Sequence, residues 1–335
     1  MKKDKKNIKL ISYKYRLQYL HKGQMKRIDR DLELCRQIYN WALGKSIEEY
    51  EKTKKSASVF TRQKELTKLK KVEKKYNLVY SGCLTNVIDR LGKAYQNFFR
   101  RVKAGENPGF PNFKKYGYYN SMTRQYQLSK PAMIDNSFEF SKNIGILKTS
   151  KHERPLPIGK VKTITLSRDG HKYFVSFSIE VNDKFFIKKI EEVKRPKILT
   201  LGGDYLSVSD KNYITPQPHI YVRYEKDLAR VNRRMDRVKY LKPDDPAKMK
   251  VRRALHKIYT KIRNLRNEFL QKKALELVKN FDKIEVNDLG LKAKLERNPD
   301  TEYNKTTLDT SYYNFSEKLK WQCEKRGLIF VKNKT

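Results

Sequence analysis

Most of the charged side chains in this chain, which are the ones best suited to bind ions, are of the two types that bind phosphate. Lysine and arginine number 77 against 37 aspartates and glutamates, which gives a formal net charge of +40 over 335 residues. The basic residues are spread along the whole chain, and a compact fold with this charge repels itself unless a polyanion offsets the repulsion. The composition therefore predicts a nucleic-acid partner, in preference to an unusually basic soluble protein or a protein of anionic membrane surfaces.

Cysteine and histidine show no pattern that predicts metal chemistry. Cys35, Cys83 and Cys323 lie far apart, with no CxxC pair and no Cys/His cluster at zinc spacing. We expect reduced, packed thiols, no zinc and no other cofactor. No segment approaches the ~18 apolar residues of a membrane-spanning helix, and the basic start Met1–Asn7 precedes an alternating stretch rather than an apolar one. These features predict a cytoplasmic protein with no membrane partner.

The first third of the chain is expected to be one strand followed by helices. Ile8–Leu20 alternates like a strand, and Thr61–Lys74 is expected to be a short basic helix. Two stronger amphipathic helices are predicted by apolar residues at three- and four-residue steps. The first series is Met25, Ile28, Leu32, Cys35, Tyr39 and Ala42, and the second is Leu84, Val87, Ile88, Leu91, Tyr95, Phe98 and Phe99.

The middle third is expected to be mainly β. Pro108, Gly109 and Pro111 end the helical region, and an aromatic and basic run follows where a helix cannot continue. The clearest hairpin pairs Val161–Ser167 with the alternating residues 173–181, with a turn at Arg168, Asp169 and Gly170.

The last third follows a charged linker, Asp183–Lys197. We expect strands at Ile198–Leu201, Tyr205–Ser209, Lys283–Asn287 and Leu328–Val331, and a late helix that Gly327 ends. Between them lie two long helices with apolar seams typical of an antiparallel pair. The seam residues are Leu228, Val231, Met235 and Val238 in the first helix, and Leu255, Ile258, Ile262, Leu265 and Phe269 in the second. Outside these seams lie basic residues that either contact phosphates or form a solvated face: Arg230, Arg233, Arg234, Arg237, Arg253 and Lys257.

Five groups of residues, in this order along the chain, carry a family resemblance. They are Gln24, Cys35, Tyr39 and Asn40; Ala94, Tyr95, Phe98 and Phe99; Gly109, Phe110, Pro111, Phe113 and Lys114; the hairpin; and Phe315, Leu319 and Gly327. In this order the chain resembles TnpB, the transposon-encoded RNA-guided DNA nuclease family related to the type V CRISPR effectors. The resemblance covers nearly the whole chain.

The resemblance implies an α+β multidomain fold. Residues 1–20 and 108–194 would form a split wedge β-barrel, with residues 21–107 inserted as a helical recognition lobe. Residues 195–335 would form a truncated RuvC-like, RNase H-like α/β domain that lacks the family's zinc segment. The implied partners are a guide RNA and double-stranded target DNA with a short adjacent motif, bound by a monomer in the bacterial cytosol or nucleoid.

In this family three carboxylates hold two divalent metal ions about 4 Å apart, which activate water and stabilise the leaving group. Thr200 occupies the first of the matching positions and Asn287 the second. The third would follow a zinc segment beyond Val331, and the chain ends at Thr335. Neutral oxygens cannot supply the charge that such a metal pair needs, so we expect no catalytic Mg²⁺ and no cleavage.

Three neighbouring carboxylates could in principle substitute for those missing. Asp204 lies four residues after Thr200, Glu285 shares a strand face with Asn287 but is displaced by about 6.6 Å, and Asp288 points the other way. A shifted alignment would restore one carboxylate and not three.

The chain is therefore similar to the TnpB-like nuclease-dead repressors, which occupy a promoter without cutting it. The alternatives are an active guided nuclease and a general RNA-binding protein without a DNA target.

The resemblance also suggests contact residues. For the motif beside the target these are Arg62, Gln63, Ser81, Thr85, Gln125 and Gln127. Their alternative roles are helix capping for Ser81 and ordinary surface for the others. For guide RNA or heteroduplex the residues are Phe110, Phe113, Lys114, Lys115, Tyr119, Arg124, Tyr126, Lys160, Lys162, Arg230, Arg233, Arg234 and Arg237. Packing into the barrel is the alternative role for the aromatic members of this group.

Overall fold

A computed structural model describes residues 9–53, 58–126, 132–150, 155–181, 196–201, 205–208, 214–216, 218–287, 309 and 311–333, with backbone alone in the strands within 196–216. The chain forms two compact units, Met1–Asn182 and Asp183–Thr335, and each is considered by itself. Residues 182–195, which hold most of the expected linker, lie outside the described residues.

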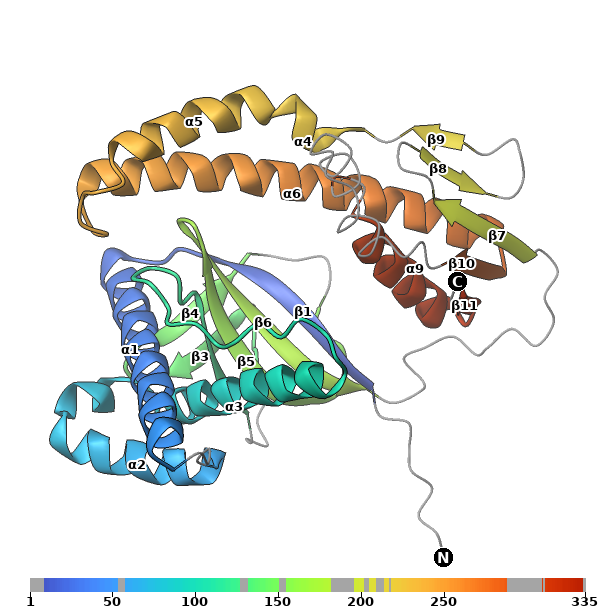
Figure 1. Cartoon of the computed structure of the whole chain (residues 1–335). Helices are drawn as coiled ribbons and strands as arrows, with labels where there is room; N and C mark the ends of the chain where they lie inside the picture. Colours follow the sequence, from blue (N-terminus) through green and yellow to red (C-terminus); the bar gives the residue numbers. More distant parts are fainter. Residues whose placement is uncertain are drawn as a thin grey trace, which may run out of the picture. The chain divides into compact units, whose positions relative to one another are not determined.

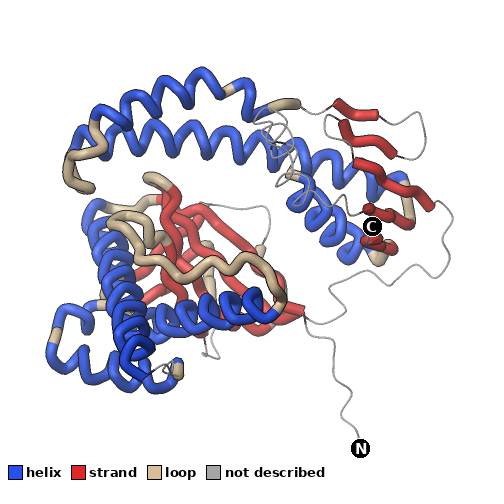
Figure 2. The backbone as a smooth tube through the Cα atoms, viewed as in Figure 1, coloured by secondary structure: helices blue, strands red, loops and turns tan. Residues whose placement is uncertain are grey.

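The first unit contains a curled, antiparallel six-stranded sheet (Figures 1 and 2). Its order is β2-β5-β6-β1-β4-β3, so the N-terminal strand lies inside a sheet built otherwise from the middle of the chain. The strands are β1 (Lys9–Gln18), β2 (Ser121–Gln125), β3 (Ser137–Ser141), β4 (Gly145–Thr149), β5 (Lys160–Asp169) and β6 (Lys172–Val181).

Alternation places one face of this sheet in the core. Val175, Phe177 and Ile179 of β6 are fully buried, whereas the residues between them are only partly buried. The expected hairpin is confirmed, but its turn was predicted too early. Asp169 pairs with Lys172, so the loop consists of Gly170 and His171, and Gly170 has a φ of +64°, which glycine adopts without strain.

Three α-helices and a short 3₁₀ helix lie between β1 and β2 in the described sequence. Helix α1 (Lys22–Thr53) buries the predicted apolar face and extends well beyond it. Helix α2 (Val59–Val72) begins two residues earlier than predicted, because the Ser58 hydroxyl accepts a hydrogen bond from the Thr61 amide and caps it. A short 3₁₀ helix (Lys74–Leu78) precedes α3 (Ser81–Lys103), whose buried residues are Cys83, Leu84, Val87, Ile88 and Leu91.

The second unit contains a mixed five-stranded sheet of order β11-β10-β7-β8-β9. Its strands are β7 (Pro196–Leu201), β8 (Tyr205–Val208), β9 (Ile214–Pro216), β10 (Lys283–Asn287) and β11 (Ile329–Asn333). The first three form an antiparallel meander, and β10 lies parallel to both β7 and β11. Four of these strands were predicted from the sequence, whereas β9, which has only three residues, was missed.

The described helices of this unit are α4 (Ile220–Arg223), α5 (Glu225–Arg237), α6 (Pro246–Asn280) and α9 (Tyr312–Arg326). Helices α5 and α6 form the expected antiparallel pair (Figure 1). Phe315, Leu319 and Cys323 of α9 are fully buried with Ile284 and Val286 of β10. Among the described residues, no helix is long and apolar enough to cross a membrane.

Candidate nucleic-acid interface

The two positions at which the resemblance expects carboxylates lie on neighbouring strands. Val286 of β10 is opposite Leu199 of β7 in a parallel pair. The next residues along the two strands are Asn287 and Thr200, so their backbones stand side by side, about 4.8 Å apart. The fold thus places the two positions predicted from the sequence side by side. They are occupied by an asparagine and a threonine and not by carboxylates.

Of the carboxylates considered as substitutes, only Glu285 lies within the described residues. It forms an ion pair with Lys283 at 2.5 Å and accepts a hydrogen bond from Asn333 Nδ2 at 3.5 Å. The bond from Lys283 holds the pKa of Glu285 below its usual value. This carboxylate is therefore already paired.

Cysteines behave as packed side chains. Cys35, Cys83 and Cys323 are all buried and none forms a disulfide. Burial raises the pKa of the Cys83 thiol to about 12, so it stays protonated at neutral pH. Within the described part of the chain, no group of three or more His, Cys, Asp or Glu side chains is arranged to hold a metal ion.

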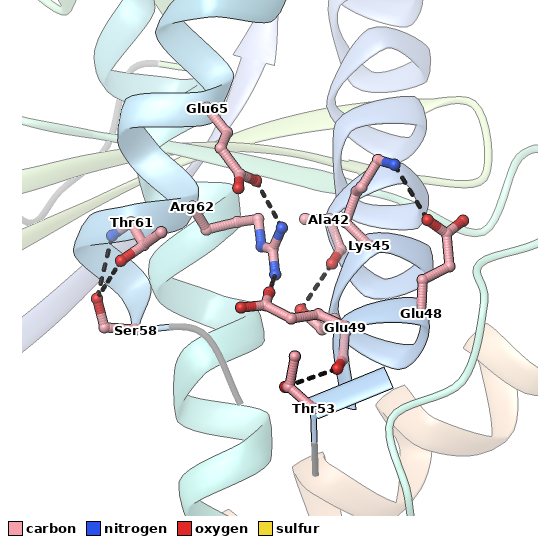
Figure 3. Close-up of polar contacts among 10 residues, drawn as sticks. Ala42, Lys45, Glu48, Glu49, Thr53, Ser58, Thr61, Arg62 and Glu65 are labelled. Atoms are coloured by element: carbon pink, nitrogen blue, oxygen red, sulfur yellow. Dashed lines mark hydrogen bonds and ion pairs between the residues drawn. The ribbon is translucent and has the colours of Figure 1, made fainter. Parts of the chain in front are cut away.

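Arg62 does not present its guanidinium to solvent. The residue is 4% exposed, and it pairs with Glu49 of α1 at 2.6 Å and with Glu65 of its own helix at 2.5 Å (Figure 3). A DNA contact by Arg62 would require both ion pairs to open. Neighbouring Gln63 is also engaged, since its amide donates to Asp89 of α3 at 2.8 Å. In this structure both side chains hold α2 against the other helices.

The start of α3 gathers several of the other residues suggested for motif contact. Ser81 is exposed, and its hydroxyl accepts a hydrogen bond from Lys70 of α2 at 3.1 Å. Thr85 donates to the Ser81 carbonyl one turn below. The alternative role of Ser81 as a helix cap is wrong, because Tyr80 is the N-cap residue and Ser81 is already helical. Gln125, at the end of β2, is exposed, and Gln127 lies outside the described residues.

Arg124 of β2 joins this group through aromatic rings. Its guanidinium lies 5.3 Å from the ring centre of Tyr80, 5.6 Å from that of Tyr126 and 5.8 Å from that of Phe140. Stacking of this kind restricts a long side chain to one position. Tyr80 and Lys70 were not predicted from the sequence. Tyr80 directly precedes Ser81 in sequence, and this position was its only signal. Lys70 reaches Ser81 across the interface between α2 and α3, which the sequence does not show.

The aromatic residues proposed to stack on RNA fall into two classes. Tyr119 is 8% exposed and Tyr126 is 9% exposed, so for these two the structure supports packing, the alternative that the sequence left open. Burial raises the pKa of Tyr119 well above its usual value. Phe113, in contrast, is 55% exposed and Phe110 is 45% exposed, although Phe110 makes edge contacts with Tyr95 and Phe98 of α3.

The basic residues suggested for phosphate contact lie mostly at the surface. Lys115, Lys160 and Lys162 are exposed, and Lys162 pairs with Glu180 at 2.9 Å. The four arginines of α5 are all exposed; Arg230 pairs with Asp227, one turn away, at 2.7 Å. Leu228 and Val231 are buried on the opposite side of α5, as the seam predicted.

Comparison with known proteins adds three likenesses. The helix-turn-helix domain family HTH_OrfB_IS605 matches residues 9–55. Over the described part of that range the chain forms β1 followed by the single long helix α1. The putative RNA-guided DNA endonuclease InsQ of Escherichia coli (strain K12) is 25% identical over 313 residues, which cover 88% of this chain and 73% of InsQ.

The third likeness is to a solved structure and concerns the fold. A chain in the cryo-EM structure of a Cas12f1–sgRNA–target DNA complex matches with a TM-score of 0.52 and 13% identity, over 93% of this chain and 73% of that chain. The sequence resemblance, the matched N-terminal domain, the InsQ relative and this fold agree with one another. Together they make the chain similar to the TnpB-type family.

Proposed function

We propose that this protein binds DNA under the direction of a guide RNA, does not cut it, and represses transcription by occupying a promoter. The RNA pairs with one DNA strand, while the protein contacts the backbone and reads a short motif beside the target. The observation that carries the absence of cutting is the neighbouring placement of Thr200 and Asn287 on β7 and β10.

The chemical reason lies in the charge of these two side chains. A metal pair that drives phosphodiester hydrolysis is held by carboxylate oxygens, which offset the charge of the ions. A threonine hydroxyl and an asparagine amide are neutral, and Glu285 on the same strand is paired with Lys283. The proposal therefore includes no catalytic Mg²⁺ and no zinc. The order of the sheet, with β10 parallel to β7 beside an antiparallel meander, supports a RuvC-like domain for this unit.

Guide RNA and target DNA are proposed as partners on two grounds. InsQ is described as a putative RNA-guided DNA endonuclease, and the similar Cas12f1 chain is in a complex with a single guide RNA and target DNA. The net charge of +40 suits two nucleic-acid ligands. We place the protein in the bacterial cytosol or nucleoid as a monomer.

Sequencing the RNA that copurifies with the protein tests guidance directly. One dominant species with a short variable 3′ segment is the expected result, and DNA matched to that segment should be bound while a scrambled sequence is not. A broad spread of cellular RNAs, with equal binding to both DNAs, would contradict the proposal and favour a general RNA-binding protein. A cut product from matched DNA with Mg²⁺ would favour an active nuclease.

A further inference from the structure

The loop that follows α3 runs along α1 in a fixed course. The Phe113 ring lies 3.9 Å from the point where a side chain on Gly44 would begin. The next residue, Lys114, forms hydrogen bonds with Asn40 and Arg36. The loop therefore contacts α1 at positions 44, 40 and 36, which are one helical turn apart. Further on, the Gly117 carbonyl accepts a hydrogen bond from Arg168 of β5 at 3.5 Å.

Hydrogen bonds hold the backbone of this loop at its centre. The Lys114 amide donates to Asn40 Oδ1 at 2.8 Å, and the Lys114 carbonyl accepts from Asn40 Nδ2 at 3.0 Å and from Arg36 Nη1 at 2.8 Å. Arg36 is itself fixed by Glu33, which accepts from its Nε and Nη2. The loop is therefore ordered before any ligand binds, which lowers the entropy cost of binding.

Aromatic rings stand outward on this fixed backbone. Phe113 is 55% exposed and Tyr116 is 44% exposed, so neither contributes fully to a core. Single exposed apolar residues are ordinary, but rings gathered on one ordered loop form a surface suited to a ligand with flat faces. A second set of rings precedes the loop: Phe99 of α3 and Phe110 are both 45% exposed, and each contacts Phe98.

Cations accompany these rings along the chain, and they indicate the kind of ligand. Lys115 follows Lys114 in the loop, and the end of α3 supplies exposed Arg100, Arg101 and Lys103. Rings interleaved with cations bind a ligand that has both aromatic faces and phosphates. A duplex hides its base faces inside the stack, so only unpaired nucleotides match both features.

We propose that residues 113–118, here called the stacking loop, form a preformed platform on which unpaired nucleotides of the bound RNA stack, with Phe113 and Tyr116 as the stacking rings and Asn40 as the positioning residue. This inference rests on the proposed function, because it assigns a binding surface to single-stranded segments of the guide RNA. It also separates these rings from Tyr119 and Tyr126, which pack inside.

The test compares ring and charge variants of the full chain on single-stranded and duplex RNA. In Phe113→Leu with Tyr116→Leu, the side chains stay apolar but no longer have flat faces. Affinity for oligouridylate should fall by roughly five- to 150-fold per ring, with an unchanged salt slope and little change for duplex RNA. Lys114→Gln with Lys115→Gln should instead reduce the slope of log affinity against log salt by about 0.7 for each phosphate that the variant no longer binds.

Tyr313→Leu is the matched control, because Tyr313 is a tyrosine of the second unit that is 68% exposed. It should bind oligouridylate as the unaltered protein does. The inference is overturned if the ring variant binds oligouridylate normally, or if its affinity for duplex RNA falls to the same extent. Either result leaves the proposed function intact as long as one dominant RNA still copurifies, so the two failures can be told apart.

Discussion

Helices α2 and α5 are both short and rich in basic residues, yet they use their arginines in opposite ways. Arg62 of α2 is buried between two glutamates, whereas Arg233, Arg234 and Arg237 of α5 are exposed. The difference comes from helical phase. Arg62 lies four residues before buried Leu66, on the face that packs inward, whereas the α5 arginines fall between the seam positions.

Residue type alone therefore does not identify a nucleic-acid contact. Arginine suits both a buried ion pair and a phosphate contact, because its planar fork binds carboxylates and phosphates equally well. The position of an arginine relative to the apolar face of its helix determines whether it is buried in an ion pair or exposed to a phosphate. We therefore expect α2 to respond to substitution through stability, and α5 through binding.

The largest effect should follow removal of the partners of Arg62. Glu49→Ala combined with Glu65→Ala leaves a buried guanidinium without a counter-charge, which should lower the free energy of unfolding by about 3–5 kcal/mol. Chemical denaturation, with hydrogen exchange of the α2 amides to locate the transition, measures it. Glu48→Ala is the control, since the exposed Lys45–Glu48 pair (Figure 3) should contribute less than about 1 kcal/mol. Equal effects in both variants would contradict a special role for Arg62.

A second buried charge in the first unit predicts a pH dependence. Burial raises the pKa of Asp31 to about 6, despite the nearby Arg30. Because the folded pKa is above the unfolded value, ionisation disfavours folding, and stability should fall by roughly 3 kcal/mol as pH rises from about 4 to about 6. Asp31→Asn should remove this dependence. Other carboxylates titrate in the same range, so the difference between the two proteins is the quantity to measure, and a constant difference across the range would refute the prediction.

An intermediate effect is expected where α1 holds the loop. Asn40→Ala removes both hydrogen bonds to the Lys114 backbone and should cost about 1–3 kcal/mol of stability. Thermal unfolding measures the decrease, and faster hydrogen exchange at Lys114 should accompany it. An unchanged exchange rate at Lys114 would show that the loop is held by other contacts.

The smallest effect should come from one exposed arginine of α5. Arg233→Gln should remove one proposed phosphate contact, so the slope of log affinity for DNA against log salt should decrease by about 0.9, while stability changes by less than about 0.5 kcal/mol. Titrations at several salt concentrations measure the slope. An unchanged slope would mean that Arg233 belongs to a solvated face, the alternative that its sequence position also allows.

Much of the fold could be predicted from periodicity. The spacing of apolar residues predicted α1, α3, the β5–β6 hairpin and β10. An element that is buried on one face has apolar residues at a regular interval, and this interval can be read in the sequence. Strand β9 has only three residues and leaves too short a pattern. The turn of the hairpin was misplaced because Gly170 was taken as the end of the turn and not its first residue.

The site was less predictable, since it depends on contacts between distant segments. Thr200 and Asn287 were identified by resemblance, and their neighbouring placement came from strand register. The burial of Arg62 follows from Glu49 on another helix, which no local pattern shows. Phe113 is exposed and Tyr119 is buried, although both lie in one aromatic run, and the loop between them is held at Lys114 by Asn40 and Arg36 of a distant segment.

The central claim is that this chain, which is similar to TnpB-type proteins, stays on its target without cutting it. The most direct measurement incubates the purified protein and its copurified RNA with end-labelled matched DNA and Mg²⁺, and follows protection and strand length in the same sample over time. The account predicts a lasting footprint on full-length strands. Shortened strands that appear only with matched DNA would contradict it.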